Sequence, residues 1–348
     1  MRNPKSDNIK KILSEKKADA FILVSRLNRF WYSNVDVNDG SFIIITQKNS
    51  FLFADARDIN ACKAIACVDS IVESVGYKCF IEFVSALNFK KIIIEDNITL
   101  QEYEACIKPL NIACEVYDMK QLRSIKTNEE IVLLQKSADI AVKTIEWVKK
   151  TIKAGDTEID IAKKIHIHML ELGASDLSFS PIVAFGKNGG NPHHVCTKTK
   201  LKENDLITLD IGCKFKGYCS DITRTFWIKK PSPEHLYMYN LVKKAQAIGL
   251  KAAQVGVSGK EIDKTVRDFI EQDKKYGKLF LHGTGHGVGV EIHEYPNVNR
   301  NNNLPMKPNH VITIEPGVYK EGFGGVRIED TIVISEKGPI ILTKKSPK

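Results

Sequence analysis

The stretch 206-LITLDIGCKFKGYCSDITRTFWI-228 decides the fold of the larger part of this chain. Two runs of apolar and β-branched residues flank a turn, which predicts an antiparallel hairpin. A hairpin centred between Phe215 and Lys216 places Asp210 opposite Asp221, with Cβ atoms about 4.5–5.5 Å apart. Two carboxylates that face each other within apolar strands destabilise a sheet unless a cation lies between them.

The stretch 311-VITIEPGVYKEGFGGVRIEDTIVI-334 repeats this arrangement. Its glycine-rich turn is centred on Gly322, so a hairpin places Glu315 opposite Glu329, again within apolar strands. The four acids of the two hairpins carry four negative charges, which two divalent cations would neutralise. A pair of metal ions about 3.5–4 Å apart with bridging carboxylates is a known catalytic arrangement.

Ion pairs with Arg224 and Arg327 are the alternative for these acids. Two arginines leave two of the four carboxylates without a cation, so the sequence favours the pair of metal ions. Oxygen ligands favour Mn, Mg or Ca, and one imidazole among them moves the preference toward a transition metal such as Mn²⁺.

The histidines supply further candidate residues, and all nine lie at position 166 or later. In 282-HGTGHGVGVEIHEYP-296, alternating glycines leave the backbone around His286 open to the close approach of a ligand. The spacing of His282, His286 and His293 fits neither the HExxH zinc motif nor a phosphate-binding or dinucleotide-binding loop. In 186-GKNGGNPHHVCT-197, two histidines occupy a loop before the first acidic strand, where binding residues are common.

The first part of the chain predicts a small α/β domain, because apolar runs of strand length alternate with polar segments that can form helices. These runs are residues 20–24, 42–46, 51–54 and 92–95. A Thr-x-x-Glu capping box at Thr127 then begins a long amphipathic helix. We therefore expect two domains, 1–122 and 123–348, of which the second holds the chemistry.

Composition excludes several classes of protein. The chain has 348 residues, 43% of them hydrophobic and 27% charged, which is typical of globular proteins, and no apolar run is long enough to span a membrane. The net charge of +9 is spread as short basic pairs with acids nearby, which argues against a nucleic-acid partner. The N-terminus lacks a signal-peptide core, so we expect a cytoplasmic protein. The eight cysteines form no CxxC pair, and their spacing matches no zinc knuckle.

These motifs together resemble the pita-bread metallopeptidases. The strings LDIG, SDITRTF, GTGHGVG, EIHEYP, TIEPGVY and GGVRIED match that family over about residues 123–348. The strings NRFWYSN and FLFADAR resemble the smaller first domain of the creatinase, prolidase and aminopeptidase P branch. The resemblance implies an α+β fold, with a C-terminal pita-bread domain, a smaller N-terminal α/β domain and a homodimer.

The resemblance also implies a set of metal ligands. Asp210 would bind one ion, Asp221 and Glu329 would bridge both ions, and His286 and Glu315 would bind the second. Glu315 would also exchange protons with the metal-bridging water. The cofactors would be two divalent ions, with Mn²⁺ preferred and Co²⁺ or Zn²⁺ as alternatives.

The remaining residues are implied to bind the substrate. His193 and His293 would contact the scissile carbonyl, and His193 is preferred over His194, which stands where relatives often have glycine. His282 and Arg327 belong to the proline-specific branch, and methionine aminopeptidases lack them. The implied activity is that of a metallo-aminopeptidase that hydrolyses the Xaa–Pro bond of peptides with proline at the second position, through a metal-bridged hydroxide.

Three alternatives remain open at this point. An Xaa-Pro dipeptidase (prolidase) would use the same residues on a shorter substrate. A non-catalytic binding module on the same fold would have lost metal ligands, and a creatinase-like enzyme would hydrolyse a small C–N substrate without metals. Because all five ligands are present, the sequence argues against the second and third alternatives.

Overall fold

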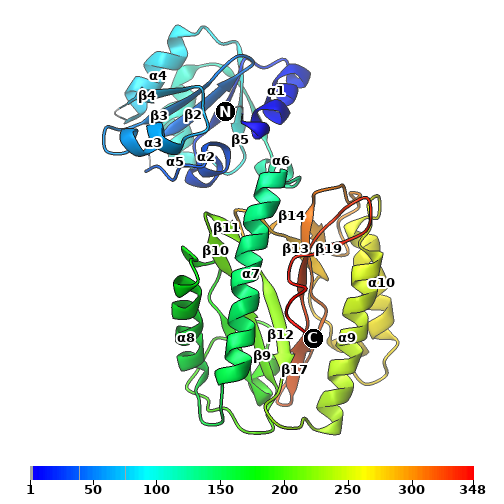
Figure 1. Cartoon of the computed structure of the whole chain (residues 1–348). Coiled ribbons are helices and arrows are strands. Elements are labelled where there is room, and N and C mark those ends of the chain that lie inside the picture. Colours follow the sequence, from blue (N-terminus) through cyan, green and yellow to red (C-terminus); the bar gives the residue numbers. More distant parts are fainter. Residues whose placement is uncertain (1–2, 39, 75) are drawn as a thin grey trace. The chain divides into compact units, whose positions relative to one another are not determined.

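The computed structural model describes residues 3–38, 40–74 and 76–348, which form two compact units, Met1–Leu122 and Arg123–Lys348 (Figure 1). The first unit is built on a mixed six-stranded sheet in the order β4-β3-β2-β1-β5-β6. Its strands are β1 (Ala20–Leu23), β2 (Phe42–Thr46), β3 (Ser50–Ala54), β4 (Ser70–Glu73), β5 (Lys91–Glu95) and β6 (Ala113–Tyr117). Its helices are α1 (Pro4–Lys16), α2 (Arg26–Ser33), α3 (Ile59–Ile65), α4 (Gly76–Ala86), α5 (Leu100–Glu102) and the turns η1 (Tyr103–Ile107) and η2 (Lys108–Leu110).

The second unit begins where α6 (Met119–Arg123) ends, and its helices form two packed pairs that flank the strands in Figure 1. The helices are α7 (Asn128–Thr151), α8 (Glu158–Glu171), α9 (Pro233–Ala252), α10 (Gly259–Glu271) and the short turns η3 (Gly186–Gly190) and η4 (Gly277–Leu279). Among the described residues, none of the helices has both the length and the apolar character needed to cross a membrane.

The strands of the second unit form several small antiparallel sheets. One sheet contains β7 (Asp176–Leu177), β10 (Cys213–Phe215) and β11 (Tyr218–Cys219), and another contains β8 (Ile182–Phe185), β9 (Ile207–Ile211) and β12 (Ile222–Phe226). The largest contains β13 (Gly285–Gly287), β14 (Glu294–Val298), β15 (Val311–Ile314), β18 (Asp330–Val333) and β19 (Ile340–Ile341), and a hairpin joins β16 (Gly317–Lys320) to β17 (Gly324–Arg327).

Side-chain caps start the two long helices that cover one side of these strands. The predicted capping box at Thr127 is confirmed, because its side chain accepts a hydrogen bond from the Glu130 amide and the Glu130 carboxylate accepts one from the Thr127 amide. Such a cap contributes about 1 kcal/mol to helix stability. Thr157 caps α8 with its side chain alone, which accepts a hydrogen bond from the Asp160 amide, and Glu158 is the first residue of that helix.

The first predicted hairpin was centred one residue too early. Asp210 pairs with Thr223, and Asp221 lies just before β12. The turn consists of Lys216 and Gly217, whose φ angles of 47° and 81° are both positive, as a two-residue type I′ turn requires. The direct opposition of Asp210 and Asp221 was therefore wrong.

The two aspartates nevertheless lie close together, since Asp210 is among the groups that raise the pKa of Asp221, and Gly212 lies between them in the hairpin. This glycine separates β9 from β10, and a Cβ atom placed on it would lie only 1.9 Å from the Ser220 carbonyl oxygen. A residue without a side chain therefore lets the two arms of the hairpin approach closely next to Asp221.

The second predicted register is confirmed. Ile314 pairs with Asp330 and Gly317 pairs with Arg327, so Glu315 and Glu329 lie opposite each other between these pairs. The hairpin turns around Gly322, whose φ of 71° lies in the region that glycine adopts without strain.

We expect the histidine at the start of β15 to make the chain less stable in acid. His310 is 5% exposed, its Nδ1 accepts a hydrogen bond from the Lys307 amide, and burial lowers its pKa to about 4, aided by Lys126 and Lys307. The unfolded chain binds a proton near the ordinary histidine pKa of about 6.5, so the folded state loses stability as the pH falls below that value. Between pH 7.5 and pH 5 this histidine should remove about 2 kcal/mol.

Urea unfolding of the wild type and of His310→Gln at both pH values would measure this effect. The wild type should lose about 2 kcal/mol more than the variant between the two pH values, because glutamine does not titrate. Equal losses in the two proteins would contradict the prediction.

Candidate metal centre

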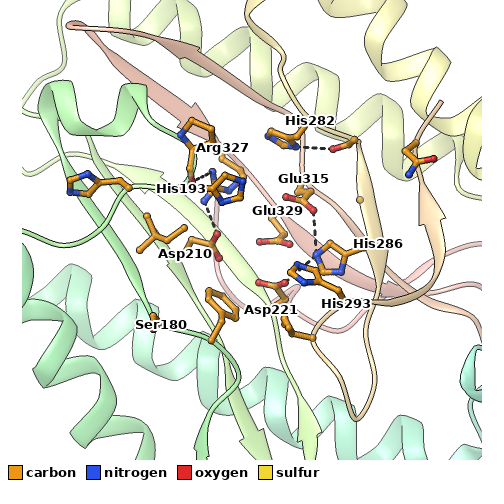
Figure 2. Close-up of a pocket in the computed structure, with 18 of the residues that line it drawn as sticks. Ser180, His193, Asp210, Asp221, His282, His286, His293, Glu315, Arg327 and Glu329 are labelled. Carbon is orange, nitrogen blue, oxygen red and sulfur yellow. Dashed lines mark hydrogen bonds and ion pairs between the residues drawn. The ribbon is translucent and has the colours of Figure 1, made fainter. Parts of the chain in front are cut away.

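All nine residues singled out in the sequence line one cavity of about 560 Å³ (Figure 2). Different strands and loops of the second unit supply them, and the carboxylates together with His286 point toward a common space in the figure. The nine residues are His193, Asp210, Asp221, His282, His286, His293, Glu315, Arg327 and Glu329.

Three of these side chains form a compact group of potential metal ligands. One ligand atom from each of Asp221, His286 and Glu329 lies within 4.8 Å of the other two. The Nε2 atom of His286 is 3.4 Å from Asp221 Oδ2 and equally 3.4 Å from Glu315 Oε1. Glu315 therefore extends the group to a fourth side chain.

The hydrogen bonds of His286 leave one nitrogen available to a metal ion. Its Nδ1 lies 3.0 Å from the carbonyl oxygen of Gly287, which can only accept a hydrogen bond, so we infer that Nδ1 carries the proton. The lone pair of Nε2 then faces Asp221 and Glu315. Such an arrangement, in which the outer nitrogen is held by a backbone carbonyl, is typical of histidines that bind metals.

Burial makes the negative charges of this group costly. The pKa values of Asp221 and Glu329 are raised well above the usual range, first by burial and then by the neighbouring carboxylates, including Asp210 and Glu315. Both side chains are almost completely buried, at 5% and 1% exposed. A positive charge inside the group would reverse this effect, since an opposite charge favours the ionised carboxylate.

Asp210 stands beside the group and has one oxygen without a partner. Its Oδ2 accepts a hydrogen bond of 2.6 Å from Arg327 Nη2. Its Oδ1 is buried and, among the described residues, has no hydrogen-bond partner. Arg224 instead forms an ion pair with Asp330 and donates a hydrogen bond to the backbone carbonyl of Glu329. Of the two arginines considered in the sequence, only Arg327 forms an ion pair with a carboxylate that lines the cavity, among the described residues.

Tyr319, which the sequence analysis did not single out, forms hydrogen bonds with both His282 and Arg327. Tyr319 is buried, and its hydroxyl accepts a hydrogen bond of 2.8 Å from Arg327 Nη1. The same hydroxyl lies 2.8 Å from Nε2 of His282, whose Nδ1 is 2.8 Å from the Gly283 carbonyl. The pKa of His282 is lowered by burial, so the ring is neutral, Nδ1 donates to Gly283 and Nε2 accepts from Tyr319.

Two family models match this chain. Residues 132–336 match the model of metallopeptidase family M24, and residues 5–125 match the creatinase/prolidase N-terminal domain. The chain belongs to metallopeptidase family M24. The resemblance seen in the sequence is confirmed, as is the predicted α+β fold class with its two domain types.

Relatives and solved structures match this metallopeptidase over nearly its whole length. A Mycoplasma genitalium protein, provisionally named an Xaa-Pro aminopeptidase, is 38% identical over 345 residues, which cover 98% of this chain and 96% of its own. The Xaa-Pro dipeptidase from Bacillus anthracis is 33% identical with a TM-score of 0.93, over 99% of this chain and 98% of its own. The X-Pro aminopeptidase from Thermotoga maritima is 32% identical with a TM-score of 0.89, over 95% and 97%.

The residues of this metallopeptidase fit the divalent ions that its family implies. Cations among these side chains would explain three observations. They would bind the buried oxygen of Asp210 that has no hydrogen-bond partner among the described residues and the available nitrogen of His286. They would also offset the cost of the buried negative charges of Asp221 and Glu329. The donor set of carboxylate oxygens with one imidazole suits hard or borderline divalent ions.

The polar residues that hold these ligands are threonines on neighbouring strands. Thr223 donates a hydrogen bond of 2.8 Å to Glu329 Oε2 and accepts one of 3.1 Å from Arg327 Nε. Thr313 accepts a hydrogen bond from the His286 amide and donates one to Glu315 Oε1. Thr313 lies two residues before the carboxylate that it contacts, a spacing that could have revealed it, whereas Thr223 contacts Glu329 and Arg327 from a distant segment.

The two consecutive histidines have different surroundings. His193 is exposed to the cavity and lies beside Arg327 and Asp210 in Figure 2. His194 is also at the edge of the cavity, but its Nε2 is held 2.8 Å from the buried carboxylate of Glu158. These surroundings are consistent with the choice of His193 as the candidate for substrate contact.

Proposed function

We propose that this metallopeptidase hydrolyses the bond between the first residue of a peptide and a proline at the second position. The observation that carries the proposal is the linked group of His282, Tyr319 and Arg327, of which His282 and Arg327 line the same cavity as the acidic group. The names of the relatives, which include Xaa-Pro aminopeptidases and Xaa-Pro dipeptidases, support it.

We propose that Asp210, Asp221, His286, Glu315 and Glu329 hold two divalent ions, and that Mn²⁺ is the preferred metal. Four carboxylates and one imidazole are the donor set that favours Mn²⁺, while Co²⁺ and Zn²⁺ remain alternatives. When bound, such ions would polarise the scissile carbonyl and make a water molecule more acidic.

The protein groups around the metal site would guide the reaction. The carboxylate of Glu315 would accept a proton from the attacking water and pass it on to the leaving nitrogen. His193 and His293 would donate hydrogen bonds to the carbonyl oxygen as negative charge develops on it. The rings of His293 and His286 make an edge-to-face contact, with centroids 4.4 Å apart, so His293 lies next to the proposed metal ligands.

Recognition of proline is proposed for His282 and Arg327. An Xaa–Pro bond has no N–H group to donate to the enzyme, so its recognition depends on shape and on the carbonyl and carboxylate groups of the substrate. Arg327 is 4% exposed, and its contacts with Asp210, Tyr319 and Thr223 hold the guanidinium at the wall of the cavity. A fixed cation at this place can bind substrate oxygens.

Hydrolysis of Ala-Pro-Ala and Ala-Pro after chelation and addition of Mn²⁺, Co²⁺ or Zn²⁺ tests this function. We expect release of alanine from the tripeptide, with the highest rate in Mn²⁺, and no cleavage of Ala-Ala-Ala. Cleavage of the dipeptide alone would replace the aminopeptidase with the dipeptidase, the second candidate that the names of the relatives support. Failure to cleave either proline peptide with any of the metals would reject both.

We also propose domains of residues 1–122, creatinase-like, and 123–348, catalytic with the pita-bread fold. The two compact units and the ranges of the family matches support these limits. A cytoplasmic location is supported by the eight cysteines, which lie in the described part of the chain as free thiols. The proposed homodimer follows from the resemblance to the family, and light scattering of the purified protein tests it.

A further inference from the structure

The loop that carries His193 is held by a buried carboxylate from a helix. We define the His193 loop as residues 185–199. Glu158, at the start of α8, has no exposed surface, and its two oxygens accept hydrogen bonds from both arms of this loop. Before the histidines, the Phe185 amide and Asn188 Nδ2 donate to Oε1 at 2.9 and 2.8 Å. After them, the Thr197 amide and hydroxyl donate to Oε2 at 2.9 and 2.7 Å.

His194 provides the bond to Glu158 that lies nearest to the cavity. Its Nε2 is 2.8 Å from Glu158 Oε2, and its side chain is only 10% exposed. His193 is the preceding residue, so the bond of His194 restricts the backbone from which the His193 ring extends. Because neighbouring side chains leave the backbone in different directions, tying one ring to Glu158 leaves the other free to face the cavity.

Glu158 is well suited to act as an ionised anchor. Burial would raise its pKa, but the hydrogen bonds from Asn188, His194 and Thr197 outweigh this effect and lower the pKa below its usual value. The partial positive charge at the start of α8 also favours an anion there. Hydrogen bonds to an ionised acceptor are about twice as strong as those between neutral groups.

The opposite side of the loop rests on the hairpin that bears Arg327. A Cβ atom on Gly325 would lie 2.1 Å from the carbonyl oxygen of Gly189, so the two backbones touch directly. Nη1 of Arg327 also donates a hydrogen bond of 3.4 Å to the carbonyl oxygen of Pro192, the residue before His193. The loop therefore lies between α8 and the strand that positions Arg327.

We propose that Glu158 and His194 are positioning residues, which hold the His193 loop so that the His193 imidazole meets the scissile carbonyl. This inference rests on the proposed function, in which His193 contacts the substrate. Neither residue belongs to the proposed ligand set, so they would act on His193 rather than on the metal ions.

A double-mutant cycle of His193→Ala and His194→Ala tests this role. We expect His194→Ala to lower kcat/KM for Ala-Pro-Ala about ten- to a hundredfold, since a misplacement of about 1 Å can cost about a hundredfold. The double variant should be no slower than His193→Ala alone, because His194 acts through His193. Losses that multiply in the double variant, or a weaker affinity of His194→Ala for Mn²⁺, would overturn the proposal.

Amide hydrogen exchange provides a readout that does not depend on activity. In His194→Ala and in Glu158→Gln, exchange should become faster in residues 185–199, while the other elements of the second unit keep their protection. His166→Ala is the matched control, because His166 lies on the same helix, its side chain is 42% exposed and its Nε2 is 3.7 Å from Asp176. This control should change neither exchange in the loop nor kcat/KM.

The two measurements separate the inference from the proposed function. If the wild type cleaves no Xaa–Pro peptide, the proposed function fails, and with it the catalytic purpose of the loop. If the wild type is active but exchange in the His193 loop is unchanged in His194→Ala, the positioning role is wrong and the proposed function stands. Should Glu158→Gln fail to fold, His194→Ala alone decides the outcome.

Discussion

Asp221→Asn is expected to abolish hydrolysis of Ala-Pro-Ala, with kcat/KM falling at least about 10³-fold, because the variant loses a shared ligand of the proposed metal pair. Titration calorimetry should show that its affinity for Mn²⁺ is lost or greatly weakened. The protein should stay folded, since asparagine has nearly the same size and shape as the carboxylate that it replaces.

The same variant should be more stable than the wild type when both are free of metal. Asp221 is 5% exposed, and burial together with Asp210 and Glu315 raises its pKa, so its ionised form is unfavourable near neutral pH. A neutral amide removes this cost, and we expect a higher midpoint of thermal unfolding in chelator. Addition of Mn²⁺ should then stabilise the wild type more than the variant, because binding to the folded state raises stability.

Asp176→Asn is a suitable control, because that side chain is 68% exposed and lies outside the cavity. It should leave both activity and the affinity for Mn²⁺ unchanged. Full activity of Asp221→Asn would refute the assignment of the metal site. A lower thermal midpoint for metal-free Asp221→Asn would show that the ionised carboxylate is not the source of instability.

Glu294→Gln should cause the largest loss of stability. Glu294 is buried with two cations: its Oε1 accepts a hydrogen bond of 3.1 Å from Arg123 Nε, and its Oε2 accepts one of 2.6 Å from Lys126 Nζ. The three side chains are 1–2% exposed. Burial alone would raise the pKa of Glu294, but the two cations outweigh this effect and keep the pKa below its usual value. Removal of the anion leaves the buried cation of Lys126 without its carboxylate, while Arg123 keeps its ion pair with the partly exposed Glu291, and breaking such a buried pair costs about 3–5 kcal/mol.

This substitution should also slow catalysis, because Glu294 follows His293. Its Oε1 accepts a hydrogen bond of 3.2 Å from the Glu291 amide, and a Cβ atom on Gly289 would lie 2.2 Å from its Oε2. The carboxylate therefore shapes the loop from which the His293 ring extends.

Urea unfolding followed by the fluorescence of Trp147 and Trp227, both in the second unit, measures the stability of Glu294→Gln. Glu291→Gln is the matched control, since Glu291 also contacts Arg123 but is 34% exposed, and its loss should cost about 1 kcal/mol or less. Combining Glu294→Gln with Lys126→Met should recover part of the lost stability, because one uncompensated cation is removed. A loss below about 1 kcal/mol in Glu294→Gln would contradict the buried ion network.

Much of the candidate site could be predicted from local patterns. The cap at Thr127 starts a helix where the sequence predicts it, because capping depends on residues within one turn. The register of Glu315 and Glu329 follows from the turn at Gly322, since a hairpin relates its strands through the turn alone. The register of Asp210 was missed because two turn centres one residue apart were both compatible with the apolar pattern.

The contacts that hold the site were beyond such patterns. Tyr319, Glu158 and Glu294 lie in different segments, and each meets a partner more than thirty positions away: His282, His194 and Arg123. No periodicity in the sequence indicates which distant polar group a buried side chain will find.

The amino-acid sequence was thus sufficient for the family, for the residues that line the cavity and for local turns and caps, because these depend on residue type and short-range spacing. The packing of distant elements determined which of two adjacent histidines is held by a buried carboxylate and which arginine pairs with an acid of the cavity. His194, and not His193, is bound by the carboxylate of Glu158, 36 positions away in the sequence. Arg327 pairs with Asp210 and Arg224 with Asp330, because the folded strands bring these residues together. Such choices depend on burial and on the pairing of charges, which exist only once the chain has folded.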